Sequence, residues 1–342
     1  RAMGAGVGSI SGTGNLTANG AFGGNMNGGN IRMIADGGIN YSGALSAIGD
    51  EEGGSILVKT ASGAINFTGP SLLAYSSDNG GNGGSIEVIK LGSGSGVTIN
   101  LGSASIDASG GDGDLEIDGG RGGSIRISSA NGDIQHTANS IAAYGGWANN
   151  SWYDFINGGK GGDGGSIEIV AASGKVTLGQ ISVDGGEGGY GNDYYSGIYP
   201  DPNPSRGGHG GKGGNFIVSA LGDVSVSTVY AWGGNGGVGS SDGAQGGSGG
   251  NGGDGGAISL SSTNGNVNFS SIEAIGGLSW DPILVQRGLS QVLQQSWGGD
   301  GGSGGNVTIL AGGAIGNILA GSIDVIGGDG GAGDVSNGSN DY

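Results

Sequence analysis

The stretch GGDGGSIEIVAASGKVTLGQISVDGGEGG, residues 161–189, decides the fold. Between its two glycine tracts lie three short segments with alternating apolar residues: Ile167 with Ile169, Val176 with Leu178, and Ile181 with Val183. Such alternation, bounded by Gly, Asn, Asp or Ser, predicts strands that bury one face. The stretch therefore predicts three short strands in a row, followed by a glycine-rich segment.

The same unit recurs along the chain, and fixed recurrence of this kind indicates a repeat architecture. First-strand pairs occur at Ile31/Met33, Ile56/Val58, Ile86/Val88, Ile125/Ile127, Ile167/Ile169, Phe216/Val218, Ile258/Leu260 and Val307/Ile309. Second-strand pairs follow about nine residues later, with Val97/Ile99 assigned in the third repeat and His136 taking an apolar position in the fourth. Third strands complete each repeat, from Leu45/Ala47 to Ile323/Val325.

Three short strands in constant order predict an all-β fold, a single-stranded parallel β-helix (β-solenoid) of about eight three-strand rungs. Rungs of parallel strands stack about 4.8 Å apart, so eight would form a rod of roughly 40 Å. We expect one domain over residues 1–342, with a partial first rung at 7–29, regular rungs over 30–333 and a tail at 334–342.

Repeat length grows while the three-strand core hardly changes. Successive first strands lie 25 residues apart between Ile31 and Ile56, but 49 apart between Ile258 and Val307. The growth falls after the third strand, which predicts insertions that leave one corner and form a second layer, at residues 145–160, 187–214, 233–256 and 277–305. Much of this material is GGxGG sequence, and we expect extended glycine segments bonded to one another, because only glycine lets main chains approach so closely.

The insertions also carry most of the large aromatic residues. Candidate residues for a partner or glycan face are Trp147, Trp152, Tyr153, Tyr190, Tyr194, Tyr195, Tyr199, Trp280 and Trp297. The alternative is that these rings form the core of the second layer. Within the last insertion, Asp281, Pro282 and the apolar spacing up to Leu293 predict one amphipathic helix.

Composition excludes several functions. The chain of 342 residues has 91 glycines, no cysteine and a net charge of −18. A strongly acidic chain is a poor partner for nucleic-acid phosphates. No apolar run is long enough to span a membrane, and the absence of cysteine excludes disulfides and CxxC metal sites while remaining compatible with secretion.

No residue set predicts catalysis. His136 and His209 are separated and have no cysteine partner, and the carboxylates Asp107, Asp184, Glu273 and Asp324 form no recurring pair with a supporting basic residue. GGDGDLEID at 110–118 is close to the calcium nonapeptide, but its aspartate is one position early and the motif is not in tandem. We expect no enzyme and no cofactor, apart from calcium bound weakly at such turns.

Units such as GGNGGSIEVIKLGSGSGVTINLGSASIDASGG, residues 80–111, resemble the glycine-rich repeats of filamentous-haemagglutinin-like exoproteins, which are secreted bacterial β-helix adhesins. The resemblance covers about residues 30–333 and rests on pattern. It implies a right-handed parallel β-helix, export to the cell surface or medium, and adhesive or structural work without catalysis. The long aromatic insertions and the absence of the family's N-terminal secretion domain depart from that pattern.

These observations predict a secreted structural or adhesive protein, at the cell surface or outside the cell. Neither end shows a polar or helical cap, so we expect self-association into a filament or homo-oligomer, in a fibre, surface layer or biofilm matrix. The alternative is a polysaccharide-binding module that uses the aromatic face. An enzyme acting on polysaccharide and an ice-binding surface remain weaker alternatives, and no nucleic acid or membrane span is expected.

Overall fold

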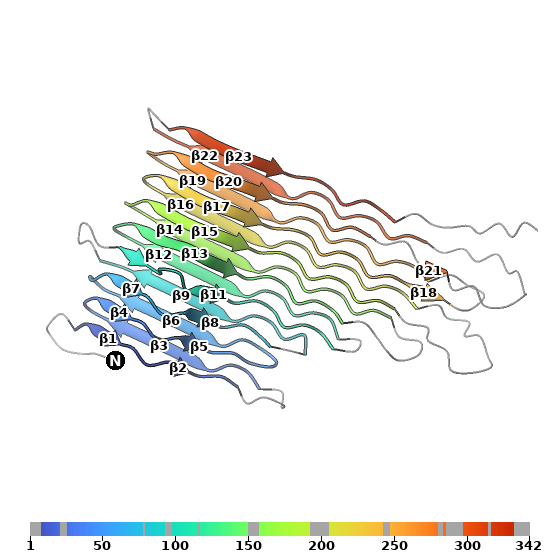
Figure 1. The fold of residues 1–342 in the computed structure, drawn as a ribbon, viewed down its shortest axis with the longest axis horizontal. Helices are drawn as coiled ribbons and strands as arrows, with labels where there is room; N and C mark the ends of the chain where they lie inside the picture. Colours follow the sequence, from blue (N-terminus) through green and yellow to red (C-terminus); the bar gives the residue numbers. More distant parts are fainter. Residues whose placement is uncertain are drawn as a thin grey trace, which may run out of the picture.

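The computed structural model describes residues 8–20, 26–77, 79–92, 98–114, 117–149, 157–191, 205–241, 247–279, 283–284, 297–313 and 316–331. Across these residues the chain is all-β and contains no helix. Every strand pair is parallel, as the repeat predicts. Figure 1 shows the strands stacked in chain order, with long segments running out from one side of the stack.

The first strands of the repeats form one parallel sheet of eight strands in chain order. Its members, each six residues long, are β3 (Asn30–Ala35), β6 (Ser55–Thr60), β9 (Ser85–Lys90), β12 (Ser124–Ser129), β14 (Ser166–Ala171), β16 (Asn215–Ala220), β19 (Ala257–Ser262) and β22 (Asn306–Ala311). Equivalent apolar residues pair directly, for example Ile125 with Ile167 and Ile167 with Phe216. The predicted register of this sheet is confirmed.

The second and third strands share a sheet of 13 strands. Two ladders begin it: β1 (Ile10–Gly12), β4 (Ile39–Tyr41), β7 (Ile65–Phe67) and β10 (Ile99–Asn100), beside β2 (Leu16–Thr17), β5 (Leu45–Ser46), β8 (Ser71–Leu73) and β11 (Ser105–Asp107). The ladders merge at β13 (Ile134–Ala142) and continue as β15 (Val176–Ser182), β17 (Val224–Tyr230), β20 (Val267–Glu273) and β23 (Ile318–Asp324). Later repeats thus form one longer strand where the earlier repeats form two.

The core lies between the two sheets and consists of the inward residues of both. Ile86, Ile106, Ile134 and Phe216 are among its fully buried members. A single repeat is not stable on its own, because it buries too few side chains to offset the conformational entropy lost when it becomes ordered. Stacking equivalent apolar residues supplies the missing burial.

The register in the third repeat differs from the prediction. Ile99, not Val97, pairs with Ile65 and Ile134, so Leu101 takes the second inward position and is fully buried. The assignment of Val97/Ile99 was therefore wrong by two residues. In a strand the side-chain period is two, so the series Val97, Ile99, Leu101 satisfies the alternation in either register.

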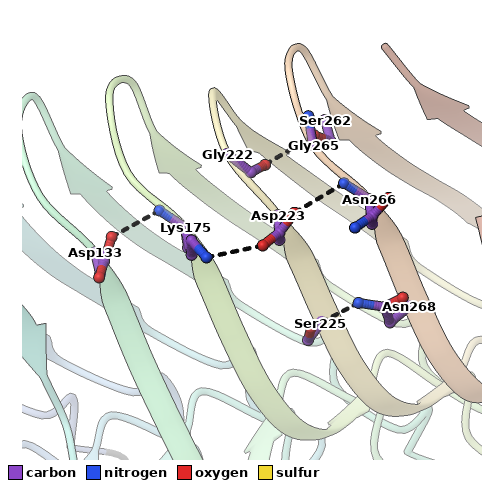
Figure 2. Close-up of polar contacts among 9 residues, drawn as sticks. All are labelled: Asp133, Lys175, Gly222, Asp223, Ser225, Ser262, Gly265, Asn266 and Asn268. Carbon is purple, nitrogen blue, oxygen red and sulfur yellow. Dashed lines mark hydrogen bonds and ion pairs between the residues drawn. The ribbon is translucent and has the colours of Figure 1, made fainter. Parts of the chain in front are cut away.

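At the corner between the sheets, side chains bridge successive repeats. The Asp133 Oδ1 atom accepts the Lys175 N–H at 2.8 Å, and Asp223 Oδ1 accepts the Asn266 N–H at 2.9 Å. The Lys175 Nζ atom lies 2.9 Å from Asp223 Oδ2, so an ion pair joins the same column (Figure 2). Asp133 and Asp223 thus each supply the acceptor for a backbone donor in the next repeat, and the ion pair joins the two repeats between them.

Beyond the third strands, the chain forms two layers of extended glycine-rich segments rather than strands (Figure 1). We call the segments that follow the third strands outgoing (108–114, 143–149, 183–191, 231–239, 274–279 and 325–331) and those that lead back to the first sheet return (117–123, 157–165, 205–214, 247–256 and 297–305). The described parts of the predicted insertions belong to these outgoing and return segments. Residues 150–156, 192–204, 242–246, 280–282 and 285–296 lie outside the described part of the chain.

Backbone hydrogen bonds join the two layers in a continuous series. Each N–H donates to the carbonyl of the preceding member at 2.8–2.9 Å along Gly120, Gly146, Gly162, Gly186, Gly211, Gly234, Gly253, Gly277, Gly302 and Gly328, which alternate between return and outgoing segments. Within a layer, Gly161 N–H donates to the His209 carbonyl and Gly210 N–H to the Asn251 carbonyl. These bonds recur every three residues, the period of an extended three-residue helix, and confirm the predicted pairing of glycine backbones.

Close approach explains the glycines of these layers. A Cβ atom added to Gly162 would lie 1.9 Å from the Gly120 carbonyl oxygen, and one added to Gly211 would lie 1.9 Å from the Gly162 oxygen. Neither residue has a positive φ angle. Glycine is thus required for distance between main chains, not for a left-handed backbone conformation.

The helix predicted over 281–293 is wrong where the structure describes it. Ile283–Leu284 forms the short strand β21, which pairs in parallel with β18 (Ser240–Ser241). The remaining residues of the predicted helix lie outside the described part of the chain. Pairing with the neighbouring insertion thus overrides the local helical pattern at these two residues.

Candidate functional site

Every third residue of the glycine layers carries a side chain, and the backbone pattern directs it away from the other layer. In an outgoing segment, one glycine N–H donates to a carbonyl of the next outgoing segment, and the following glycine N–H donates to a carbonyl of a return segment. The third residue points its side chain outward. Where the equivalent residue one repeat earlier is an aspartate, its side chain accepts the N–H of this third residue: Asp112 Oδ1 accepts the Trp147 N–H, and Asp184 Oδ1 accepts the Trp232 N–H, both at 2.8 Å. The side chains therefore form columns along the stack.

Two such columns define the outgoing face. The first is Ser109, Tyr144, Asp184, Trp232, Ile275 and Ile326; the second is Asp112, Trp147, Glu187, Asn235, Leu278 and Asp329. Neighbours in a column belong to successive repeats, because each carbonyl in a column accepts a backbone N–H from the repeat before. The outgoing face is thus a regular array of side chains on a glycine support.

The outgoing face contains a hollow of about 800 Å³. Four aromatic residues line it, Tyr75, Tyr144, Trp147 and Trp232, and so do four carboxylates, Asp107, Asp112, Asp184 and Glu187. The hollow arises because short side chains at Ser109 and Asp184 alternate with large rings at Tyr144 and Trp232 in one column. It is the best-defined candidate binding site among the described residues.

The rings at the hollow are exposed yet held in place. Trp147 is 57% exposed, Trp232 42% and Tyr144 41%. The Tyr230 ring meets Trp232 edge-on, with centroids 5.2 Å apart and planes at 72°. An exposed ring that is already oriented loses little conformational entropy when a ligand packs on it.

Burial raises the pKa of two of the carboxylates at the hollow. It raises the pKa of Asp184, against the hydrogen bonds that Ser182 Oγ (2.6 Å) and the Trp232 N–H donate to it. Burial likewise raises the pKa of Asp107, whose Oδ1 accepts the Ser109 N–H at 2.9 Å. Burial, and then the charge of Asp107, raises the pKa of the Tyr144 hydroxyl.

No Lys, Arg or His is among the described residues that line the hollow. The basic residues of the glycine layers lie on the return segments, where they alternate with acids. Arg121 Nε lies 3.7 Å from Asp163 Oδ2, and Lys212 Nζ lies 2.9 Å from Asp254 Oδ2. The return face therefore carries charges of both signs, some of them paired, whereas the charged residues of the outgoing face are acidic.

The structure divides the predicted aromatic face. Trp147 lines the hollow, whereas Tyr190 lies exposed further along an outgoing segment and Trp297 lies exposed on a return segment. Six predicted residues lie outside the described part of the chain: Trp152, Tyr153, Tyr194, Tyr195, Tyr199 and Trp280.

Sequence reasoning missed three of the four rings at the hollow: Tyr75, Tyr144 and Trp232. Each directly follows the last inward alanine of a third strand, and two of them precede a glycine pair, in AYGG and AWGG. That position, rather than the length of the insertion, is the signal that could have found them.

The histidines and carboxylates that were considered for catalysis do not come together in one site. His136 is fully buried, with Nε2 at 2.7 Å from the Ala104 carbonyl and no described partner for Nδ1. His209 Nδ1 accepts the Asn251 N–H at 2.9 Å on the return face. Asp107 and Asp184 share the hollow, while Glu273 and Asp324 pair in register on adjacent strands and do not line it. Besides burial, the charge of Glu273 nevertheless helps to raise the pKa of Asp184.

Comparisons with known proteins identify no relative, since no family model, no curated protein and no solved structure matches the chain. Within the described ranges, no three potential metal-ligating side chains come together. No helix of the described residues is long and apolar enough to cross a bilayer. The prediction of weak calcium binding remains a prediction.

Proposed function

We propose that the chain is a secreted structural and adhesive β-solenoid of about eight rungs that binds polysaccharide in the hollow of its outgoing face. The single observation that carries the binding proposal is the set of four aromatic residues around the acidic hollow. The sequence pattern supports the extracellular setting, through the resemblance to secreted β-helix adhesins.

The eight-rung solenoid is supported by the order of the two sheets. The chain visits the first sheet and then the second in each repeat, and both sheets keep chain order. A coil of this kind places each rung in contact only with its neighbours. It provides a rigid support on which the glycine layers hold side chains at fixed spacing.

A saccharide suits the hollow because it presents both apolar faces and hydrogen-bonding groups. The apolar C–H faces of sugar rings pack on aromatic rings, and their hydroxyl groups donate hydrogen bonds to carboxylates. Ligand sites commonly combine apolar walls with a few placed polar groups. The outgoing face offers both, at Tyr144 and Trp232 and at Asp184 and Glu187.

We propose binding without turnover, in keeping with the expectation that the chain is not an enzyme. Asp184 already accepts hydrogen bonds from Ser182 and from the Trp232 backbone, which fix its position. Asp107 is held in the same way by Ser109. Chromatography of oligosaccharides after long incubation tests this part, and shortened products would show an enzyme.

Affinity gel electrophoresis in gels that contain soluble polysaccharides tests the binding. We expect retardation of the wild type, and its loss in Trp232→Ala and Trp147→Ala, which remove stacking surface. Trp297→Ala is the matched control, because this exposed ring lies on a return segment. Equal retardation of all three variants and the wild type would contradict binding in the hollow.

A second proposed role, assembly into a fibre or surface layer, is supported by the last described repeat. Several of its apolar residues are exposed, with Leu319 62% exposed, Leu310 61% and Ile318 48%, and its inward residues Val307 and Ile309 are only partly buried. Strands β22 and β23 each pair on one side only within the described residues. Such edges pair readily with another chain.

Electron microscopy at several protein concentrations, with and without calcium, tests this role. Uniform fibres whose formation Leu319→Lys prevents would support assembly through the last repeat. Leu91→Lys is a control at another exposed leucine, 54% exposed and distant from that edge. Single particles at every concentration would contradict assembly.

A further inference from the structure

The charge on the outgoing face is one-sided. All the charged residues that line the hollow are carboxylates, Asp107, Asp112, Asp184 and Glu187. On the opposite face, acids such as Asp163 and Asp254 are paired with Arg121 and Lys212. The acids of the hollow therefore lack the cations that balance the return face.

We propose that the hollow selects a cationic saccharide, an oligomer of amino sugars that carry free, protonated amino groups. This inference rests on the proposed binding of polysaccharide and specifies its chemical class. Aromatic rings alone would accept neutral sugars equally well. Carboxylates between the rings add charge-assisted hydrogen bonds to ammonium groups and repel acidic sugars.

The spacing along the column suits such a ligand. Tyr144, Asp184 and Trp232 belong to three successive repeats of the same column. Parallel strands lie about 4.8 Å apart, so the two rings are separated by roughly 10 Å with the carboxylate between them. A sugar packed on each ring would bring its substituents near Asp184 from both sides.

A second acid occupies the equivalent place in the next column. Glu187 lies between Trp147 and Asn235, and its Oε1 atom accepts an N–H of the Asn235 side chain at 3.0 Å. Trp147 itself is positioned through Asp112. Two adjacent columns thus repeat the arrangement of a carboxylate beside an aromatic ring.

Calorimetry with three hexasaccharides tests the inference: glucosamine hexamer, its fully N-acetylated form and a neutral glucose hexamer. The variants are Asp184→Asn and Glu187→Gln, which remove charge and keep a side-chain oxygen as acceptor. Asp118→Asn is the matched control, because Asp118 Oδ1 accepts the Lys160 N–H at 2.8 Å in the equivalent arrangement on the return face. All three variants change the net charge equally.

We expect the wild type to bind the glucosamine hexamer at least about tenfold more tightly than the acetylated form. This preference should disappear in Asp184→Asn and persist in Asp118→Asn. It should also shrink with added salt, because screening weakens exposed charge pairs. Since burial raises the pKa of Asp184, Asp184→Asn removes a costly buried charge, and we expect its thermal midpoint to equal or exceed that of the wild type.

Equal affinity for all three oligomers, with loss in Trp232→Ala, would overturn the charge selectivity while polysaccharide binding stands. Absence of binding to every oligomer would overturn both proposals. Tighter binding of hexalysine than of the glucosamine hexamer, unchanged in Trp232→Ala, would overturn the inference in favour of a basic peptide.

Discussion

At the scale of single residues, Gly162 illustrates what the glycine layers require. An alanine Cβ would lie 1.9 Å from the Gly120 oxygen and 2.5 Å from its carbonyl carbon, both backbone atoms that a rotamer change cannot move. We expect Gly162→Ala to lower the free energy of unfolding by at least about 2 kcal/mol, the cost of forced overpacking.

Urea denaturation followed by circular dichroism measures this loss. Gly14→Ala is the control, because an added Cβ at Gly14 meets no atom within 4 Å. We expect the control to stay within about 0.5 kcal/mol of the wild type. Equal stability of Gly162→Ala and the wild type would contradict the proposed need for close approach.

His136 is a second residue whose surroundings predict a measurable effect. Its ring is fully buried, and burial lowers its pKa from the usual value. Below about pH 6.5 the unfolded chain therefore binds a proton that the folded chain resists. The contribution of His136 to the free energy of unfolding is therefore fully present above about pH 6.5. It decreases as the pH falls from that value toward the lowered pKa of the folded state.

Thermal unfolding of the wild type and His136→Leu at pH 7.5 and pH 5 measures the effect. Leucine occupies the equivalent inward position in the neighbouring strands, at Leu101 and Leu178. We expect the fall in midpoint between the two pH values to be smaller in the variant. An identical fall would show that other groups cause the acid sensitivity.

At this scale the sequence predicts most inward residues correctly, since alternation and glycine boundaries agree in nearly every repeat. It fails at Leu101, where three alternating apolar residues fit two registers. It also fails at Tyr144 and Trp232, because their position directly after the last inward alanine does not itself show which side chains of other repeats line a hollow with them.

At the scale of elements, the corner column of Asp133, Lys175, Asp223 and Asn266 joins successive repeats. The Asn266 N–H donated to Asp223, and then the Lys175 charge, lower the pKa of the Asp223 carboxyl. The stability that the Asp223 carboxylate contributes is present above the ordinary pKa of aspartate. It is lost as the pH falls through the lowered pKa of the folded state.

Asp223→Ala should therefore cost about 1 kcal/mol, because the Asn266 N–H loses its acceptor. Asp223→Asn keeps an acceptor oxygen and should retain most of the stability, since exposed ion pairs contribute little. Equilibrium denaturation of both variants separates the two effects. An equal loss in both would assign the stability to the ion pair instead.

Local sequence predicts strands better than insertions. The strands carry their own signal in alternation, whereas Asp281, Pro282 and the apolar residues that follow indicate a helix although Ile283–Leu284 pairs with Ser240–Ser241. Pairing with another insertion depends on how the layers place the two segments, which no local window contains.

At the scale of the whole molecule, each repeat contacts only its neighbours, so one repeat can be removed without changing the contacts of distant ones. Deleting residues 166–214 joins Gly165 to Asn215, so that β16 takes the place of β14 beside β12. Because β12 and β16 both pair with β14 residue for residue, the register of the sheet is kept. We expect the shortened chain to fold, with an unchanged circular dichroism spectrum per residue and a modestly lower midpoint.

Deleting residues 166–190 is the matched control, because it removes strands β14 and β15 but leaves the return segment of that repeat without its outgoing partner. We expect this chain to lose the cooperative transition. Unfolding of both deletions would contradict a stack that depends on neighbour contacts alone.

The outward columns have a consequence for how this surface changes over time. One column carries serine, tyrosine, aspartate, tryptophan and isoleucine in turn, at Ser109, Tyr144, Asp184, Trp232 and Ile275, while the glycines beneath keep the same bonds. Small polar, aromatic, acidic and aliphatic side chains are thus tolerated at equivalent points of one support. Single substitutions at these positions can therefore change which ligand the surface binds, with little effect on folding.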